Sequence, residues 1–184
     1  MKIEETPIEG LVVITPVRHG DARGFFSESW NRDRMLAHGI DVEFVQDNHS
    51  VSAQAGTLRG MHFQAPPHGQ AKLVRCGRGA LYDVAVDVRV GSPSYGAWFG
   101  IELSAENGKQ LLVPEGFLHG FMTLTDDTEI VYKCSDFYSA DADGSVLWSS
   151  CGIEWPMSVD PVLSAKDEQA IAMKDFVSPF GKSA

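Results

Sequence analysis

Two stretches decide the fold of this chain: GTLRGMHFQ at residues 56–64 and QAKLVRC at residues 70–76. Apolar and polar residues alternate in both, which is typical of strands that bury one face and turn the other toward something polar. The polar face carries cationic and titratable groups toward a shared space. The residues concerned are Arg59, His62, Gln64 and Lys72.

Such a row of groups indicates a pocket for an anionic ligand. A lone histidine is more often a satisfied core residue, and single charges are usually exposed to solvent. The three cationic or titratable groups Arg59, His62 and Lys72 together favour the pocket.

Composition limits the possible functions. With 184 residues, 43% of them hydrophobic, residues 1–184 are expected to form one domain, or a domain that a partner subunit completes. Three cysteines without CxxC spacing predict neither disulfides nor a zinc knuckle, and fit a reducing cytoplasm. A net charge of −10 argues against nucleic acid as a partner. No run approaches membrane-spanning length, so we expect a soluble protein without a membrane partner.

Short β-rich runs separated by turn residues follow one another along the chain and predict an antiparallel sandwich or barrel. A short helix is expected from Asn31, as N-cap, to His38, with Gly39 as the stop. The polar run 46–50 is explained by a surface loop at least as well as by a ligand site. No glycine-rich nucleotide fingerprint is present, which argues against a nucleotide cofactor bound by one. The expected strands cover residues 10–15, 25–30, 42 onward, 79–90, 98–103, 110–113, 117–124 and 128–136.

A second motif runs from Gly108 to Gly120 and places His119 on a strand after a Pro-x-Gly turn. Together the two motifs resemble the cupin superfamily. This resemblance implies an all-β double-stranded β-helix, the cupin jelly roll, with a few short helices. The matching positions are Gly56, His62, Gly108, Pro114, Gly116 and His119.

The metal site usual in cupins is not expected here. Gln64 stands where the second histidine ligand belongs, and the following loop, residues 65–69, has no carboxylate. Two imidazoles are too few for a dedicated metal site. His68 could supply a ligand, but its loop position favours a solvated histidine. We therefore predict no metal.

One branch of the superfamily matches more closely. Seven blocks in order resemble the dTDP-4-dehydrorhamnose 3,5-epimerase family. The resemblance implies an isomerase that acts, without a cofactor, on a dTDP-linked 4-keto-6-deoxy sugar, dTDP-4-dehydro-6-deoxy-D-glucose. It also implies a homodimer in which strands are exchanged between subunits. The blocks are residues 20–26, 45–50, 58–64, 70–74, 114–121, 132–134 and 152–156.

The residues fit that chemistry. A carbon beside a ketone loses a proton only if a base removes it and a cation stabilises the oxyanion, roles that suit His62 and Lys72. By the family pattern, Tyr132 donates a proton on the opposite sugar face; without the motif, a core aromatic would be the default. Asp167 matches the acid that orients the histidine. Ser164-x-x-Asp167 equally resembles a helix capping box, and the family pattern favours the catalytic role.

The resemblance also implies ligand-binding residues. Arg23 and Arg59 match positions that meet the diphosphate, and Tyr138 matches an aromatic that stacks on the base. Asp143 stands where the family generally has a glutamate, and the segment 149–151 is short, which puts nucleotide or sugar preference in doubt. A mono-epimerase or ketoisomerase stays open, whereas a non-catalytic binder would lack a catalytic group. Further substrate-binding positions are Phe26, Glu28, Gln46, Asn48, His119, Asp143 and Lys166.

Overall fold

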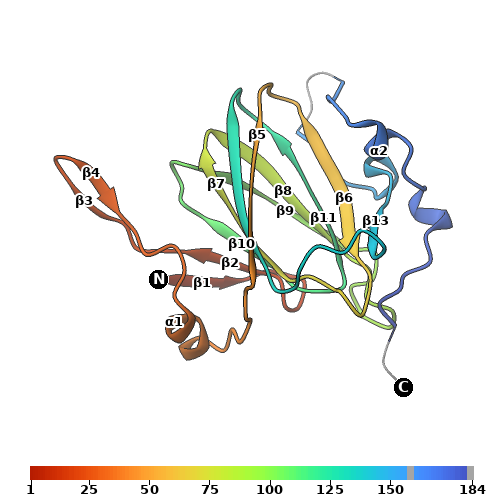
Figure 1. Cartoon of the computed structure of the whole chain (residues 1–184), viewed down its shortest axis with the longest axis horizontal. Coiled ribbons are helices and arrows are strands. Elements are labelled where there is room, and N and C mark those ends of the chain that lie inside the picture. Colours follow the sequence, from red (N-terminus) through yellow and green to blue (C-terminus); the bar gives the residue numbers. More distant parts are fainter. Residues whose placement is uncertain (157–159, 182–184) are drawn as a thin grey trace.

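Two antiparallel sheets and a projecting hairpin make up the protein (Figure 1). The computed structural model describes residues 1–156 and 160–181. Within them the larger sheet has six strands, in the order β1-β2-β10-β7-β12-β5. Its strands are β1 (Lys2–Glu5), β2 (Val12–Thr15), β10 (Gln110–Val113), β7 (Lys72–Arg78), β12 (Thr128–Cys134) and β5 (Gln46–Ser52).

The smaller sheet has five strands, in the order β13-β6-β11-β8-β9. The hairpin pairs β3 with β4 and projects as an arm from the body (Figure 1). Helices in the described ranges are short. The bounds are β13 (Asp143–Ser145), β6 (Leu58–Gln64), β11 (Phe117–Thr123), β8 (Ala80–Asp87), β9 (Trp98–Ser104), β3 (His19–Asp21), β4 (Gly24–Phe26), α1 (Arg32–Ala37), α2 (Ala165–Glu168), and 3-10 turns at Trp148–Ser150 and Met173–Asp175.

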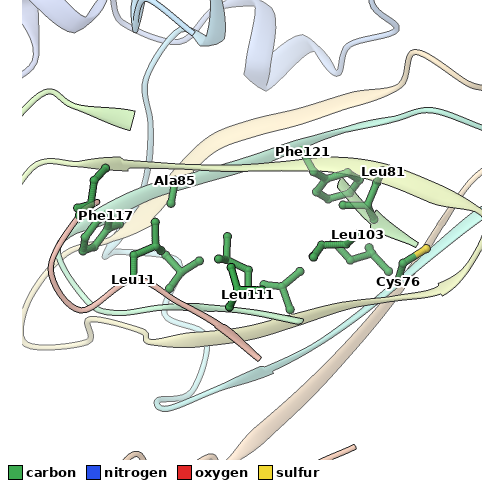
Figure 2. Packing of buried hydrophobic residues seen from close by; sticks show 13 residues of the cluster. Leu11, Cys76, Leu81, Ala85, Leu103, Leu111, Phe117 and Phe121 are labelled. Carbon is green, nitrogen blue, oxygen red and sulfur yellow. The ribbon is translucent and has the colours of Figure 1, made fainter. Parts of the chain in front are cut away.

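The main core lies between the sheets. Alternation along each strand sends every second side chain inward, and the inward apolar side chains of both sheets meet. Figure 2 shows Ala85, Phe117 and Phe121 facing Leu11 and Leu111. The outer face of the five-stranded sheet is covered by the C-terminal segment, which contributes Trp155 and Phe176 to a second cluster. The sandwich expected from the sequence is therefore present.

Two sequence-based expectations about strands are wrong. The strand expected over 25–30 ends at Phe26, because Phe25 and Phe26 lie on the exposed arm rather than on a core sheet. Residues 46–50, for which a surface loop was considered, belong to β5, and strand structure begins at Gln46 rather than at Val42. Helix α1 is confirmed, with Asn31 as N-cap. No helix in the described ranges has the length and apolar character to cross a membrane.

Two glycines let β6 and β11 approach closely. Gly60 has φ +144°, and a Cβ on it would lie 2.6 Å from the Cα of Gly120. A side chain at either position would push the strands apart. The close approach sets the pairing in which His62 lies directly opposite His119.

Candidate active site

The site is organised around a pair formed by His62 and Asp167. Nε2 of His62 donates to Oδ1 of Asp167 at 2.6 Å. The histidine side chain is 31% exposed and the carboxylate only 3%. A carboxylate on Nε2 fixes the imidazole tautomer and leaves Nδ1 as the basic nitrogen.

Asp167 also belongs to a helix cap, so both interpretations of its motif hold geometrically. Ser164 is the N-cap of α2, and its hydroxyl accepts from the Asp167 backbone N–H. The same hydroxyl donates to Oδ2 of Asp167 at 2.9 Å. Burial raises the pKa of Asp167, but the hydrogen bonds and charge of His62, together with Ser164, outweigh it and hold the pKa below its usual value.

A cavity of about 300 Å³ opens beside this pair. Arg59 and Lys166 line it together with His62 and Asp167. The guanidinium of Arg59 donates to the Ser52 hydroxyl at 3.3 Å, which orients it. Two cations beside an imidazole are the groups that an anionic ligand would need.

Lys72 and Tyr132 lie on the inner face of the six-stranded sheet. The Lys72 ammonium lies 5.9 Å from the centroid of the Tyr132 ring, which packs against the main core. Burial lowers the pKa of Lys72, although the nearby charges of Cys134, Asp143 and Asp83 partly oppose this. Burial also raises the pKa of Tyr132, so its phenol keeps its proton at neutral pH.

A hydrogen-bonded chain runs from this region to Tyr138. Asn48 donates to the sulfur of Cys134 at 3.6 Å and accepts from the Gln46 amide at 3.0 Å. Gln46 in turn accepts from the Tyr138 backbone N–H at 3.0 Å. The Tyr138 phenol lies 3.4 Å from Asp143, which forms an ion pair with Lys166 of the cavity. These side chains therefore form one connected region.

His119 forms a second histidine–aspartate pair, which reasoning from sequence missed. Its Nε2 donates to Oδ1 of Asp83 at 2.9 Å, and both side chains are buried. No role was expected for Asp83 from the sequence. The available signal was its spacing from Asp87, since two aspartates on one face of an apolar strand each need a buried partner. Asp87 finds its partner in Arg89, away from the site.

Of the residues expected to bind substrate, Arg59 and Lys166 line this cavity. Five others do not line it: Gln46, Asn48, His119, Tyr138 and Asp143. The remaining three lie on or next to the arm. Arg23 lies on the arm and pairs with Asp21. Phe26, also on the arm, is 71% exposed. Glu28 pairs with Arg34 at 3.1 Å. Figure 1 shows the arm at the opposite end of the molecule from α2 and β6, which carry the His62–Asp167 pair.

The residues present do not resemble a metal centre. Gln64, at the position of a cupin ligand, uses its amide on three backbone groups. Nε2 of both His62 and His119 is taken by a carboxylate. His68 is half exposed and lies 3.2 Å from Asp136. Among the described residues, no group of three or more His, Cys, Asp or Glu could hold an ion.

Comparisons with known proteins agree with one another. The family model described as dTDP-4-dehydrorhamnose 3,5-epimerase matches residues 5–175. A dTDP-4-dehydrorhamnose 3,5-epimerase from Sinorhizobium fredii is 53% identical over 169 residues, covering 91% of this chain and 87% of the relative.

Two solved structures extend the comparison. The dTDP-6-deoxy-D-glucose-3,5-epimerase of Legionella pneumophila, in complex with dTDP-4-keto-L-rhamnose, is 41% identical with a TM-score of 0.92, covering 96% of this chain and 94% of that chain. A 3'-monoepimerase from Streptomyces bikiniensis, in complex with dTDP-quinovose, is 39% identical with a TM-score of 0.86, covering 92% and 86% respectively. This chain belongs to the dTDP-4-dehydrorhamnose 3,5-epimerase family.

Proposed function

We propose that this isomerase converts dTDP-4-dehydro-6-deoxy-D-glucose to dTDP-4-dehydro-L-rhamnose by inverting C3 and C5, a step of dTDP-L-rhamnose biosynthesis. One observation carries the proposal: the hydrogen bond between His62 and Asp167 lies on a cavity that Arg59 and Lys166 also line. A general base beside two cations suits a substrate that combines an acidic carbon with a diphosphate.

The first half of each inversion is removal of a proton. His62 takes the proton from the carbon beside the 4-keto group. The electron pair of the broken C–H bond forms a double bond to C4, and a pair of the C4 carbonyl moves onto its oxygen, which gives the enolate. The Lys72 ammonium stabilises the negative oxygen, and Asp167 stabilises the imidazolium. No oxidant or cofactor is needed, because the electrons stay within the sugar.

The second half is return of a proton to the other face. The Tyr132 phenol gives its proton to the enolate carbon, and the phenolate then regains one from solvent, while the imidazolium releases its own. Support comes from the raised pKa of Tyr132, which keeps the donor protonated before each step.

We also infer that the site is completed in a strand-exchanged homodimer. The arm, which carries Arg23 and Phe26, lies at the opposite end of the molecule from α2 and β6 (Figure 1). It exposes Phe25 and Phe26 to 59% and 71%. Such exposure of neighbouring aromatics is typical of a surface that another chain covers. An arm that crosses to a second copy would bring a phosphate-binding arginine to that copy's site.

The finer architecture we infer is the cupin jelly roll, formed by residues 1–184 as one domain. Strands β5 to β12 alternate between the sheets, except that β8 and β9 pair within the five-stranded sheet. The strand orders are β5-β12-β7-β10 and β6-β11-β8-β9. Two interlocked Greek keys produce this arrangement. The free thiols Cys76, Cys134 and Cys151 fit a reducing cytoplasm.

A second candidate function is inversion of one carbon only. Its support is the similarity to a 3'-monoepimerase and the aspartate at position 143, which lies beside Tyr138 and Lys166. The same base and acid would serve one inversion or two. The difference would therefore lie in how the sugar is seated.

Turnover in deuterated water separates the two candidates. Because each inverted carbon receives its hydrogen from a solvent-exchanging phenol, we expect deuterium at both C3 and C5 of dTDP-4-keto-6-deoxyglucose. Mass spectrometry and NMR of the reduced product locate the label. Label at one carbon after prolonged turnover would establish the mono-epimerase, and no label would refute an epimerase.

A further inference from the structure

The segment that carries Tyr138 has no sheet or helix to hold it. It joins the end of β12 at Cys134 to the start of β13 at Asp143 without regular structure. The Tyr138 side chain is 61% exposed. Backbone polar groups in such a segment need partners from elsewhere if its aromatic side chain is to keep one direction.

Gln64 supplies two of these partners. Its Nε2 donates to the Phe137 carbonyl at 3.0 Å, and its Oε1 accepts from the Ser139 backbone N–H at 2.9 Å. The amide thus bonds to the residue on each side of Tyr138, as a peptide group in a neighbouring strand would. Its Nε2 also donates to the His68 carbonyl, and the side chain is only 6% exposed.

Gln46 holds the remaining donor. It accepts from the Tyr138 backbone N–H at 3.0 Å, and its own amide is oriented by Asn48. Gln64 belongs to the five-stranded sheet and Gln46 to the six-stranded sheet. The Tyr138 backbone is therefore fixed from both halves of the sandwich, which sets the direction in which the ring leaves the chain.

We propose that Gln64 is a positioning residue for the nucleotide: it presents the Tyr138 ring to the base and takes no part in proton transfer. The inference rests on the proposed function and on the role that the family resemblance implies for Tyr138, stacking on the base. Gln64 stands at the position of a cupin metal ligand, and in this protein its amide holds the backbone on each side of Tyr138.

Loss of the Gln64 hydrogen bonds should therefore weaken nucleotide binding without slowing the chemical step. Without the hydrogen bonds of Gln64, the segment that carries Tyr138 has to be ordered when the nucleotide binds. The conformational entropy lost in that ordering makes binding less favourable. We expect a loss of affinity of about 10- to 100-fold, the scale of reordering one or two residues. Proton transfer by His62 involves none of these hydrogen bonds, so turnover at saturation should persist.

The test uses Gln64→Met, which keeps the volume but removes the hydrogen bonds, and Gln64→Glu, which keeps only the acceptor for Ser139. Asn107→Ala is the matched control, because the Asn107 amide likewise bonds three backbone groups, in a turn away from the site. Calorimetry gives the Kd of dTDP, steady-state kinetics gives KM and kcat, and thermal melting reports folding.

We expect Gln64→Met to raise the Kd of dTDP and KM about tenfold or more, with kcat within about threefold of the parent. Gln64→Glu should weaken binding at least as much as Gln64→Met, because a carboxylate oxygen would face the carbonyls of His68 and Phe137. Asn107→Ala should lower the melting temperature and leave Kd unchanged. An unchanged Kd in either folded Gln64 variant, or a fall in kcat at unchanged KM, would overturn the proposal.

Tyr138→Ala separates failure of this inference from failure of the proposed function. If the parent does not bind dTDP, the proposed function of this site is wrong. If the parent binds dTDP and Tyr138→Ala binds it as tightly, Tyr138 does not contact the base and this inference fails while the proposed function stands. If Tyr138→Ala weakens binding and Gln64→Met does not, only the positioning role is wrong. Because Gln64 acts through Tyr138, adding Gln64→Met to Tyr138→Ala should change Kd less than about twofold.

Discussion

His62 and His119 lie opposite each other on paired strands, and each bonds through Nε2 to Oδ1 of an aspartate, Asp167 and Asp83 respectively. Their surroundings differ. His62 is 31% exposed on an open cavity, and its acid comes from α2, outside the sheets. His119 is 9% exposed, and its acid lies on the adjacent strand β8 of the same sheet.

The difference teaches that pairing alone does not identify a catalytic base. A base needs access to substrate and a partner for its charged form, and His62 has both. The His119–Asp83 pair is buried, and Oδ2 of Asp83 finds no partner among the described residues. We therefore expect loss of His62 to affect turnover most and loss of His119 to affect stability most.

The largest expected effect is that of His62→Asn. Without the base, kcat should fall by about 10³- to 10⁴-fold, while the Kd of dTDP changes little, because the cations and Tyr138 are intact. Single-turnover kinetics and calorimetry measure the two. If His62→Asn lost turnover only because the variant unfolds, His62 would be a structural residue like His119, and the two pairs would not differ in role.

Lys72→Met should lower kcat by about 10²- to 10³-fold, because the enolate oxygen loses its cation. It should also raise the melting temperature at pH 7. Burial lowers the pKa of Lys72, so the native state binds this proton less readily than the unfolded state and the charge costs stability below the unfolded pKa.

The stability gained in Lys72→Met should shrink as the pH approaches about 10.4, where the unfolded lysine also loses its proton. Melting curves from pH 7 to pH 10 test this. A variant no more stable than the parent across that range would show that Lys72 is well solvated.

Asp167→Asn should cost less, about 10- to 100-fold in kcat, because the base remains but loses its orienting charge. The pKa of Asp167 lies below its usual value, so the unfolded chain binds this proton at higher pH. The carboxylate therefore stabilises the native state above about pH 4, and this contribution disappears as the pH falls further. The variant should lose less stability than the parent between pH 5 and pH 3, as measured by denaturant titration. A change in melting temperature without a change in kcat would reduce Asp167 to a helix cap.

His119→Asn should change kcat by no more than about tenfold but should destabilise the protein by about 3 kcal/mol, because the Asp83 carboxylate is left buried without its charge partner. For a chain of this size that corresponds to a melting temperature lower by roughly 6 to 12 °C. Replacing Asp83 as well, in His119→Asn/Asp83→Asn, should recover part of the loss. A turnover defect as large as that of His62→Asn would make the two pairs equivalent.

The smallest expected effect is that of chelation. Because the Nε2 atoms of both histidines are occupied by carboxylates and Gln64 is committed to backbone groups, exhaustive dialysis against EDTA should leave kcat unchanged. Metal analysis before and after dialysis is the check. Stoichiometric metal lost together with activity would contradict it.

Local pattern was sufficient for most of the fold. Alternation identified the strands around His62 and Lys72, the Pro-x-Gly turn preceded the strand of His119, and the Asn31 cap located α1. Alternation failed for β5. The inward side chains Gln46 and Asn48 of this strand are polar because they hydrogen-bond to each other and Gln46 bonds to the Tyr138 backbone, so they do not resemble core residues.

The contacts that complete the site are the part that pattern could not predict. Asp83 on His119 and Gln64 on the Tyr138 segment join residues 36 and 75 positions apart, and no local spacing encodes such a meeting. Asp167 could be named only because the family resemblance was added to a motif that fits a helix cap equally well. The arm was misjudged because Phe25 and Phe26, apolar residues typical of a core strand, are exposed in the single chain.

The place of Asp167 on α2 has a consequence for the enzyme's response to heat. A helix of four residues is too short to persist by itself and depends on its cap and on the backbone bonds that Val162 makes with Gly56 and Leu58. Fluctuations that open this segment cost far less free energy than melting the sheets. Each opening would detach the acid from His62 while the sandwich stays folded. Warming should therefore lower turnover reversibly before the protein denatures, with a temperature optimum set by the α2 segment and not by the core.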